Sequence, residues 1–210
     1  MRNLVVIEYS SLDGVIQAPG HTAEDRAGGF AHGGWTAPLM EQHGRYNSAS
    51  FQTAGAFLLG RRTYEIWAPY WPTVTDPDDL IAQALNTLPK YVASRTLTRA
   101  DWPETTIIRD VPRGVAALKN EPGKPIFVLG SADLAQTLIG HGLVDEYQLW
   151  LHPVVLGLGK RLFRETTRRV DLALVDSRTA VGGLVILTYV PTAGAATTRG
   201  GEATGAAPSS

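Results

Sequence analysis

The chain alternates short apolar runs of strand length with segments that have the pattern of helices. Strands are expected at residues 4–9, 56–59, 90–93, 106–108 and 126–130, and helices at 37–53, 61–67, 111–120 and 131–143. A further helix is expected directly after the acidic segment 76–79, because acidic residues favour the positive end of the helix dipole. This alternation predicts an α/β domain with a central, mostly parallel sheet.

Two later runs, 147–151 and 184–189, are separated by no segment with clear helical periodicity. They predict antiparallel strands at one edge of the sheet. The domain is expected to span residues 1–191. Residues 192–210 are rich in glycine, alanine, threonine and serine, which predicts a disordered tail.

Composition narrows the classes of function. With 210 residues, 44% of them hydrophobic, the chain is long enough for one domain with a sizeable core. A net charge of -1 gives no reason to expect binding to nucleic acid or to an acidic membrane surface. The absence of cysteine excludes disulfides and thiolate catalysis, and the five histidines show no ligand spacing that predicts a metal site. The short apolar run at the N-terminus does not fit a signal peptide, so a cytoplasmic location is expected.

Three strand-to-helix junctions have small or cationic residues at the mouth of the helix. They are LLGRRT at 58–63, YVASRT at 91–96 and VLGSAD at 128–133. The N–H groups at a helix N-terminus are unpaired and attract phosphate, and such junctions lie at the carboxyl edge of a parallel sheet. Together they predict a site for a ligand with several phosphates, such as a dinucleotide.

Each junction also has a plainer interpretation. Arg61 and Arg62 could pair with surface acids such as Glu65, Arg95 could be a solvated turn residue, and Ser131 could be an ordinary N-cap. No G-x-G-x-x-G or G-x-x-x-x-G-K-[ST] motif is present, which argues against Rossmann and P-loop sites. The GLGK segment at 157–160 precedes no clear helix and is expected in a hairpin-type connection.

Several segments together resemble the dihydrofolate reductase superfamily and, more narrowly, stand-alone proteins related to the C-terminal reductase domain of the bacterial riboflavin enzyme RibD. The segments are SLDGVI at 11–16, HGGWTAPL at 32–39, LLGRRTYE at 58–65, KYVASRTL at 90–97, FVLGSADLAQTLIGHGLVDEYQL at 127–149 and PVVLGLGKRLF at 153–163. The resemblance covers about residues 2–190. It implies a three-layer dihydrofolate reductase-like fold, an NADPH cofactor and a homodimer.

The resemblance also implies where the cofactor binds. Gly60, Arg61, Arg62 and Thr63 would hold the pyrophosphate, and Ser94 and Arg95 the adenosine 2′-phosphate. Gly130, Ser131 and Ala132 would pack on the pyrophosphate from the other side. Dihydrofolate reductases usually have consecutive glycines at that place, so the Gly-Ser-Ala sequence is closer to RibD-type relatives.

The substrate pocket is less clearly marked in the sequence. Asp13 lies in the segment that closes over nicotinamide in the family, although Asp13-Gly14 also fits a simple turn. His32 and Trp35 could line the pocket or anchor their loop. In dihydrofolate reductases a carboxylate early in the helix after the tryptophan-containing loop binds the pteridine. Glu41 is the acid nearest to that position in this chain, but its spacing differs from that of the family. No catalytic acid or base is identified.

These features predict an NADPH-dependent oxidoreductase acting on a small heterocyclic or carbonyl-containing substrate. Within the resemblance, the most specific substrate is the ribosylamino-pyrimidine precursor of riboflavin, although the zinc deaminase half of RibD has no counterpart in this chain. The alternatives are a dihydrofolate-type reductase and a nucleotide-binding protein of the same fold without turnover.

Overall fold

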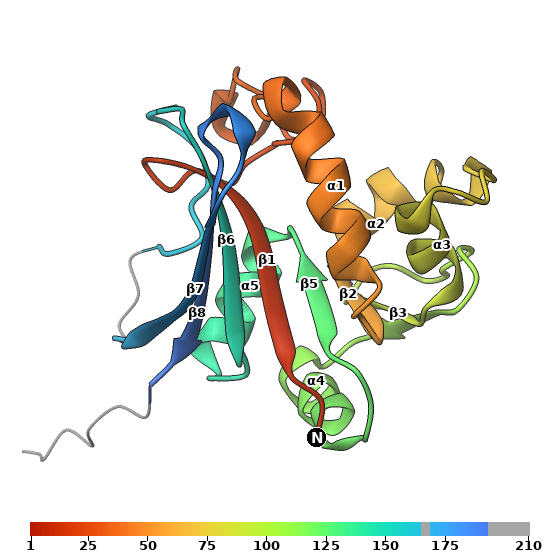
Figure 1. Cartoon of the computed structure of the whole chain (residues 1–210). Coiled ribbons are helices and arrows are strands. Elements are labelled where there is room, and N and C mark those ends of the chain that lie inside the picture. Colours follow the sequence, from red (N-terminus) through yellow and green to blue (C-terminus); the bar gives the residue numbers. More distant parts are fainter. Residues whose placement is uncertain (165–168, 193–210) are drawn as a thin grey trace, which may run out of the picture.

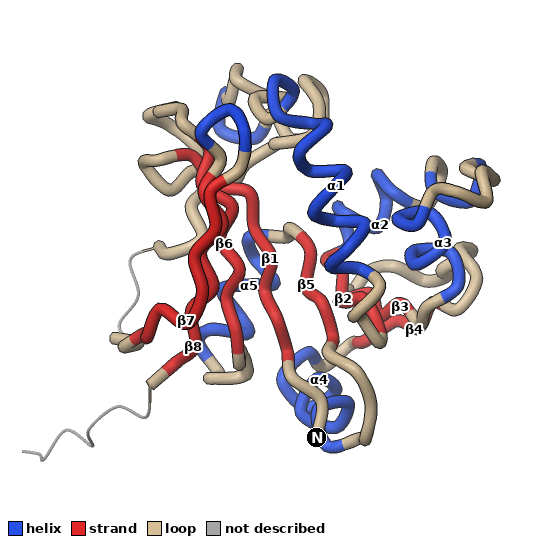
Figure 2. The backbone as a smooth tube through the Cα atoms, in the orientation of Figure 1, coloured by secondary structure: helices blue, strands red, loops and turns tan. Residues whose placement is uncertain are grey.

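The computed structural model describes residues 1–164 and 169–192, and its framework is one eight-stranded sheet. The strands are β1 (Leu4–Ser11), β2 (Ala56–Gly60), β3 (Lys90–Ala93), β4 (Thr105–Ile108), β5 (Ile126–Leu129), β6 (Glu146–His152), β7 (Leu172–Thr179) and β8 (Val185–Pro191). Their order is β4-β3-β2-β5-β1-β6-β8-β7. The pairings from β4 to β6 are parallel, whereas β8 is antiparallel to both β6 and β7. Figure 2 shows β6, β8 and β7 together at one side of the sheet and β3 and β4 at the other.

Five α-helices and several 3₁₀ turns connect the strands among the described residues (Figure 1). The α-helices are α1 (Met40–Phe51), α2 (Arg61–Trp67), α3 (Leu80–Thr87), α4 (Val111–Asn120) and α5 (Ala132–Gly140), and the 3₁₀ turns are η1 (Ala27–Gly29), η2 (Ala37–Leu39), η3 (Trp71–Thr73) and η4 (Val181–Gly183). Helices α1, α2 and α3 pack on one face of the sheet and α4 and α5 on the other. The three-layer α/β fold with antiparallel C-terminal strands is therefore confirmed.

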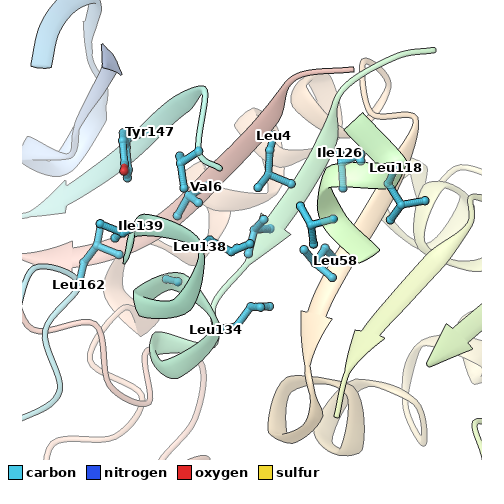
Figure 3. Packing of buried hydrophobic residues seen from close by; sticks show 14 of the residues in the cluster. Leu4, Val6, Leu58, Leu118, Ile126, Leu134, Leu138, Ile139, Tyr147 and Leu162 are labelled. Carbon is cyan, nitrogen blue, oxygen red and sulfur yellow. The ribbon is translucent and has the colours of Figure 1, made fainter. Parts of the chain in front are cut away.

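The sheet is buried on both faces, which explains why its central strands are almost entirely apolar. Side chains alternate along β1, so that Leu4 and Val6 face α5 while Val5 and Ile7 face α1 and α3. Figure 3 shows the α4–α5 side, where Leu134 and Leu138 of α5 pack on the sheet. Two packed layers of this kind hold the carboxyl ends of the strands in fixed positions.

Local signals in the sequence account for most helix boundaries. The Asp79 carboxylate caps α3 by accepting hydrogen bonds from the N–H groups of Ile81 and Ala82, both at 2.9 Å. Helix α5 is terminated by Gly142, two residues beyond its last residue, whose φ of 63° is readily adopted only by glycine. The Leu143 N–H then donates to the Leu138 carbonyl at 3.0 Å, as in a Schellman motif.

Three expectations about the elements were wrong. No helix begins in the described residues between β3 and β4, because the chain continues through a turn, so the segment at 91–96 is a strand-to-turn junction. The helix expected over 37–53 is divided, because Pro38 lies in the 3₁₀ turn η2 and α1 begins only at Met40. Strand β7 was missed because it is an edge strand with mostly exposed side chains, so it lacks a continuous apolar run. The tail expected from residue 192 lies, beyond Thr192, outside the described residues.

The order of the strands matters most for the site. Strands β3, β2 and β5 are neighbours and all parallel, so the three junctions at 58–63, 91–96 and 128–133 lie side by side at one edge of the sheet. None of the helices in the described part of the chain is long and apolar enough to span a membrane.

Candidate functional site

A cavity of about 1060 Å³ lies along this edge of the sheet. The nine residues predicted to hold a cofactor all line it: Gly60, Arg61, Arg62, Thr63, Ser94, Arg95, Gly130, Ser131 and Ala132. They come from three separate segments that the parallel pairing of β3, β2 and β5 brings together. The structure thus places them around one space, and their role in holding a cofactor stays a prediction.

The hydroxyl of Ser131 joins two of the junctions directly. It accepts a hydrogen bond from the Gly60 N–H at 2.8 Å and lies 2.7 Å from the Thr63 hydroxyl oxygen. Gly130 and Ser131 both have left-handed backbones, with φ of 59° and 71°. Ser131 occupies the N-cap position of α5, but its side chain makes no capping hydrogen bond. The interpretation of Ser131 as an ordinary N-cap was therefore wrong, because its hydroxyl crosses to β2 instead.

At the third junction Ser94 organises the turn that presents Arg95. Its hydroxyl accepts hydrogen bonds from the N–H groups of Thr96, at 3.2 Å, and Leu97, at 2.9 Å. The Arg109 guanidinium donates to the Ser94 carbonyl at 2.9 Å, and Arg109 also lines the cavity. Neither Arg95 nor Arg109 forms an ion pair with any residue in the described ranges.

The other two arginines of the cavity are paired with acids. Arg61 forms an ion pair with Glu65 at 3.0 Å, as the plainer interpretation anticipated. Arg62 lies 3.3 Å from the Asp25 carboxylate, which is also 2.5 Å from the Lys160 ammonium. Burial alone would raise the pKa of Asp25, but the Lys160 ammonium, a backbone N–H and the Arg62 guanidinium hold that pKa below its ordinary value. Asp25 is therefore ionised and forms ion pairs with two cations at the wall of the cavity.

Another part of the lining is apolar and aromatic. On α1, Met40, His43, Asn47 and Phe51 lie on one helix face, because they are separated by three or four residues. Arg62 and Thr63 line the cavity from the first turn of α2. Ile66 and Trp67, each four residues farther on, lie on the same sides of this helix and also line the cavity. The remaining apolar lining on this side comes from Trp71, Ile81 and Leu85. We call the lining from α1, η3 and α3, together with Ile66 and Trp67, the apolar end of the cavity.

Buried polar groups adjoin the apolar end. The imidazole of His43 is stacked on the ring of Tyr9, with centroids 4.4 Å apart, and its Nε2 lies 2.7 Å from Nε2 of His152. Burial, followed by the neighbouring His152, lowers the pKa of His43 to about 4, so this imidazole is neutral at pH 7. The Asn47 amide donates to the Tyr9 hydroxyl at 2.6 Å. Burial raises the pKa of Tyr9 to about 12.

Glu8 is a carboxyl group inside an otherwise apolar strand. It lines the cavity, its side chain is buried, and Oε1 has no hydrogen-bond partner among the described residues. Burial, with a smaller contribution from Glu24, raises the pKa of Glu8 to about 8. At neutral pH this group is therefore mostly protonated and can donate a hydrogen bond.

The four residues predicted for the substrate pocket do not line the cavity, so these assignments are corrected. Asp13 instead fixes the SLDG turn: its carboxylate accepts hydrogen bonds from the Ser11 hydroxyl at 2.6 Å and from the N–H groups of Leu156, at 3.1 Å, and Gly157, at 2.8 Å. The Ser11 hydrogen bond, followed by these backbone N–H groups, lowers the pKa of Asp13 to about 2. Asp13 therefore anchors the loop that contains the GLGK segment, which is not followed by a helix.

The other three residues predicted for the substrate pocket, His32, Trp35 and Glu41, lie outside the cavity lining as well. The Trp35 indole donates to the Gln17 carbonyl at 2.8 Å and packs in a small cluster with Val15 and Phe30. His32 is exposed, and Glu41 forms a solvent-exposed ion pair with Arg45, one helical turn away. Trp35 is thus a loop anchor, and Glu41 faces away from the cavity.

Reasoning from the sequence missed several of the polar lining residues. Glu8 had a visible signal, a single charge within the apolar run LVVIEY. His43 and Asn47 share a helix face, but the sequence does not show what that face covers. Lys160 reaches the cavity from the GLGK segment, next to Asp25, which is 135 residues away in the chain.

Comparison with known proteins gives a family for this geometry. The family model described as the RibD C-terminal domain matches residues 2–186, a range that contains every residue lining the cavity. The chain belongs to the RibD C-terminal domain family.

Relatives in sequence and structure agree with this membership. Two uncharacterised proteins of Bacillus subtilis (strain 168) are similar: YyaP is 40% identical over 134 residues, 63% of this chain and 71% of YyaP, and YwjB is 30% identical over 141 residues, 67% of this chain and 75% of YwjB. A protein of Shewanella sp. PV-4 assigned to riboflavin biosynthesis has a similar fold, with a TM-score of 0.58 and 19% identity over 91% of this chain and 99% of that one. A pyrimidine reductase-like protein of Corynebacterium diphtheriae NCTC has a TM-score of 0.55 and 14% identity over 91% of this chain and 92% of that one.

Proposed function

We propose that this protein is an NADPH-dependent reductase of a small heterocyclic or carbonyl-containing substrate. The observation that carries the proposal is the convergence of three neighbouring strand ends on one cavity; two of them lead into a helix and the one after β3 leads into a turn. Arg62, Arg95 and Arg109 line the cavity at these strand ends, which we call its cationic end, whereas the lining from α1, η3 and α3 is apolar and aromatic. The cationic end offers N–H and guanidinium groups to phosphates, and the apolar end offers aromatic surface to a flat ring. Membership of the RibD C-terminal domain family and the name of the pyrimidine reductase-like neighbour favour reduction as the reaction.

The residues present fit NADPH at the cationic end. Arg62, Arg95 and Arg109 supply guanidinium groups, which bind phosphate oxygens through paired N–H donors. We assign Arg62, Thr63 and Gly130–Ala132 to the pyrophosphate, and Ser94 and Arg95 to the 2′-phosphate. A Cβ at Gly130 would lie 3.5 Å from the Thr63 hydroxyl oxygen, so the glycine keeps this part of the wall low enough for a phosphate to approach.

Bound there, NADPH supplies a hydride, and the chain has to align the acceptor and exclude water. The apolar end, with Phe51, Trp67 and Trp71 in its wall, provides a dry surface for a flat ring. Glu8, buried and mostly protonated at neutral pH, is a candidate to orient the cofactor or the substrate by donating a hydrogen bond. Arg62 would exchange Asp25 for a phosphate oxygen when the cofactor binds.

Reduction of the ribosylamino-pyrimidine precursor of riboflavin is the most specific form of the proposal. It is supported by the family and by the neighbour assigned to riboflavin biosynthesis. A dihydrofolate-type reductase is less well supported, because Glu41 pairs with Arg45 at the surface and does not enter the cavity. A nucleotide-binding protein without turnover is the alternative from another class.

The test is a fluorescence titration with NADPH and NADH, followed by assays of NADPH oxidation. The acceptors are the pyrimidine precursor, dihydrofolate and simple ring carbonyls. We expect NADPH to bind more tightly than NADH and to be oxidised in the presence of one acceptor class. Tight NADPH binding with no turnover on any acceptor would favour the non-catalytic alternative. Absence of NADPH binding would refute the proposal.

A further inference from the structure

We propose that the carboxylate of Asp25 binds the hydroxyl groups of the ribose that joins the pyrophosphate of the cofactor to its nicotinamide. The inference rests on the proposed function, which supplies the cofactor and the assignment of its phosphates to the strand ends. It goes further by assigning a residue to the half of the dinucleotide that carries the reactive ring.

The order of the strands gives the direction in which the cofactor crosses the edge of the sheet. Its 2′-phosphate is assigned to the junction after β3, and its pyrophosphate to the junctions after β2 and β5. Figure 2 shows that the next strands in this direction are β1 and β6. Gln17 follows β1 in the chain, Lys160 follows β6, and both line the cavity. The nicotinamide half of the dinucleotide is therefore expected beside Gln17 and Lys160.

Asp25 is held next to both of these residues. The Gln17 side-chain amide donates to the Asp25 carbonyl at 3.1 Å, and its oxygen accepts from the Lys160 backbone N–H at 3.0 Å. The Lys160 ammonium lies 2.5 Å from Oδ2 of Asp25, and the Ala27 N–H donates to Oδ1 at 3.0 Å. These contacts fix the carboxylate of Asp25 at the wall of the cavity beside the segments that follow β1 and β6.

A ligand in the cavity can reach this carboxylate. The Asp25 side chain is 18% exposed and lines the cavity, and the Arg62 guanidinium, 3.3 Å from Oδ1, belongs to a side chain that is 63% exposed. An ion pair with so exposed a partner contributes little, so a phosphate can replace Asp25 at the guanidinium at small cost. A phosphate bound by Arg62 brings the sugar attached to it next to Oδ1.

The chemistry of the carboxylate suits a sugar with two neighbouring hydroxyl groups. An ionised carboxylate only accepts hydrogen bonds, and its two oxygens together offer about four acceptor sites. The Ala27 N–H and the Lys160 ammonium keep two of these sites when Arg62 turns to a phosphate, which leaves room for hydroxyl donors. Acidic residues bind ribose hydroxyls in this way in dinucleotide-binding folds of another kind. Lys160 also balances the negative charge of Asp25, so the carboxylate can lie near a phosphate.

A matched pair of dinucleotides isolates these hydrogen bonds. NADP⁺ and the analogue that lacks both hydroxyl groups of the nicotinamide ribose have the same charge and the same rings. Calorimetric titration of the whole protein should show NADP⁺ binding at least about tenfold more tightly, as expected for a hydrogen bond to a charged group. Equal affinity for the two ligands would overturn the inference and leave the proposed function intact. Failure of NADP⁺ and NADPH to bind at all would refute the proposed function, and this inference with it.

Variants then assign the preference to Asp25. Asp25→Ala removes the acceptor, so we expect its preference for NADP⁺ to fall to within about twofold, while the analogue binds it at least as tightly as it binds the wild-type protein. A merely structural role for Asp25 would weaken both ligands alike, and that result would refute the assignment. A tenfold preference that survives in Asp25→Ala would place the acceptor elsewhere.

Glu24→Ala is the matched control for this variant. Glu24 is the adjacent carboxylate of the same loop and also lines the cavity, but its side chain accepts a hydrogen bond from the Gly20 N–H at 2.6 Å. Glu24→Ala changes the net charge as Asp25→Ala does and should keep the full preference for NADP⁺. An equal loss of the preference in both variants would assign it to the loop as a whole and refute the role of Asp25.

A crystal structure of the wild-type protein with NADP⁺ tests the same contact without a variant. We expect a hydroxyl oxygen of the nicotinamide ribose at about 2.5–3.0 Å from the Asp25 carboxylate, with Lys160 still paired to Asp25 and Arg62 turned to the pyrophosphate. A nicotinamide ribose whose hydroxyls bind other groups would refute the inference.

Discussion

The contact between Gly60 and Ser131 joins two of the three junctions, and a double-mutant cycle can measure it. A Cβ at Gly60 would lie 2.5 Å from the Ser131 hydroxyl oxygen and 2.6 Å from the Ser131 Cβ, both well inside contact distance. The backbone of Gly60, with φ of -75° and ψ of 160°, is one that alanine adopts freely. The cost of Gly60→Ala is therefore steric and comes from Ser131 alone.

The size of the effect can be worked out for each corner of the cycle. Overpacking costs about 1–3 kcal/mol, and loss of the hydrogen bond from the Gly60 N–H to the Ser131 hydroxyl costs about 1 kcal/mol more, so Gly60→Ala should lose about 2–4 kcal/mol of stability. Ser131→Gly loses the hydroxyl contacts but relieves a left-handed backbone worth about 1 kcal/mol, and should be nearly neutral. In the double variant the added Cβ meets no side chain. The double variant should therefore be more stable than Gly60→Ala by about 2 kcal/mol.

Equilibrium unfolding in urea measures all four proteins, and NADPH titration on the same samples reports whether the junction is still assembled. Gly140→Ala at the end of α5 is the control, since a Cβ there meets nothing within 4 Å and Gly140 does not line the cavity. Effects of Gly60→Ala and Ser131→Gly that add within about 0.5 kcal/mol would refute the reasoning, because independent sites behave in that way.

Three further expectations concern charged side chains. Arg95→Ala should raise the KM for NADPH about tenfold more than that for NADH, because only NADPH has the 2′-phosphate, whereas Arg62→Ala should raise the KM for both cofactors alike; equal effects of Arg95→Ala on both cofactors in steady-state kinetics would contradict the assignment of Arg95 to the 2′-phosphate. Burial raises the pKa of Glu8 from 4.5 to about 8, so the folded protein keeps a proton that the unfolded chain has lost. Unfolding free energy should therefore fall as pH rises from about 4.5 to about 8, and Glu8→Gln should flatten this slope; an unchanged slope would contradict it. Burial lowers the pKa of Lys90 from 10.5 to about 8, so the sign is opposite: stability should rise between about pH 8 and 10.5 in the wild-type protein and less so in Lys90→Met, which urea unfolding at each pH will decide.

The cationic end of the cavity could be predicted because its signals are local. The junctions at 58–63 and 128–133 each consist of an apolar strand, a small residue and the start of a helix, all within six consecutive residues. The junction at 91–96 has the strand and the small residue but is followed by a turn. The same locality explains why the bounds of α2 and α4, and the start of α3 directly after the acidic segment 76–79, were predicted correctly. That the junctions lie side by side follows from the order β3-β2-β5, which the sequence alone does not state.

What the sequence could not show depends on partners that are distant in the chain. Ser131 had an ordinary N-cap as its plainer interpretation because serine commonly caps helices, but its hydroxyl bonds to Gly60, which is 71 residues away. Asp13 and Trp35 were assigned to a pocket by their loop, but the loop folds so that Asp13 reaches Gly157 and Trp35 reaches Gln17. A polar side chain in a loop has too many possible partners for local pattern to choose among them.

The two ends of the cavity therefore differ in how far their ligands can be inferred. Backbone N–H groups and arginines at strand ends recognise phosphate in any protein, so the cationic end indicates its ligand class from short motifs. The apolar end is assembled from α1, η3 and α3 with part of α2, and the imidazole of His43 is held there by a contact with His152 at the end of β6, 109 residues away. The family supports the cofactor end, whereas the substrate has to be inferred from His43, Asn47 and the aromatic wall of this particular chain. If the substrate of a relative differs, the difference should lie at these positions on α1 and not at Gly60, Ser94 or Gly130.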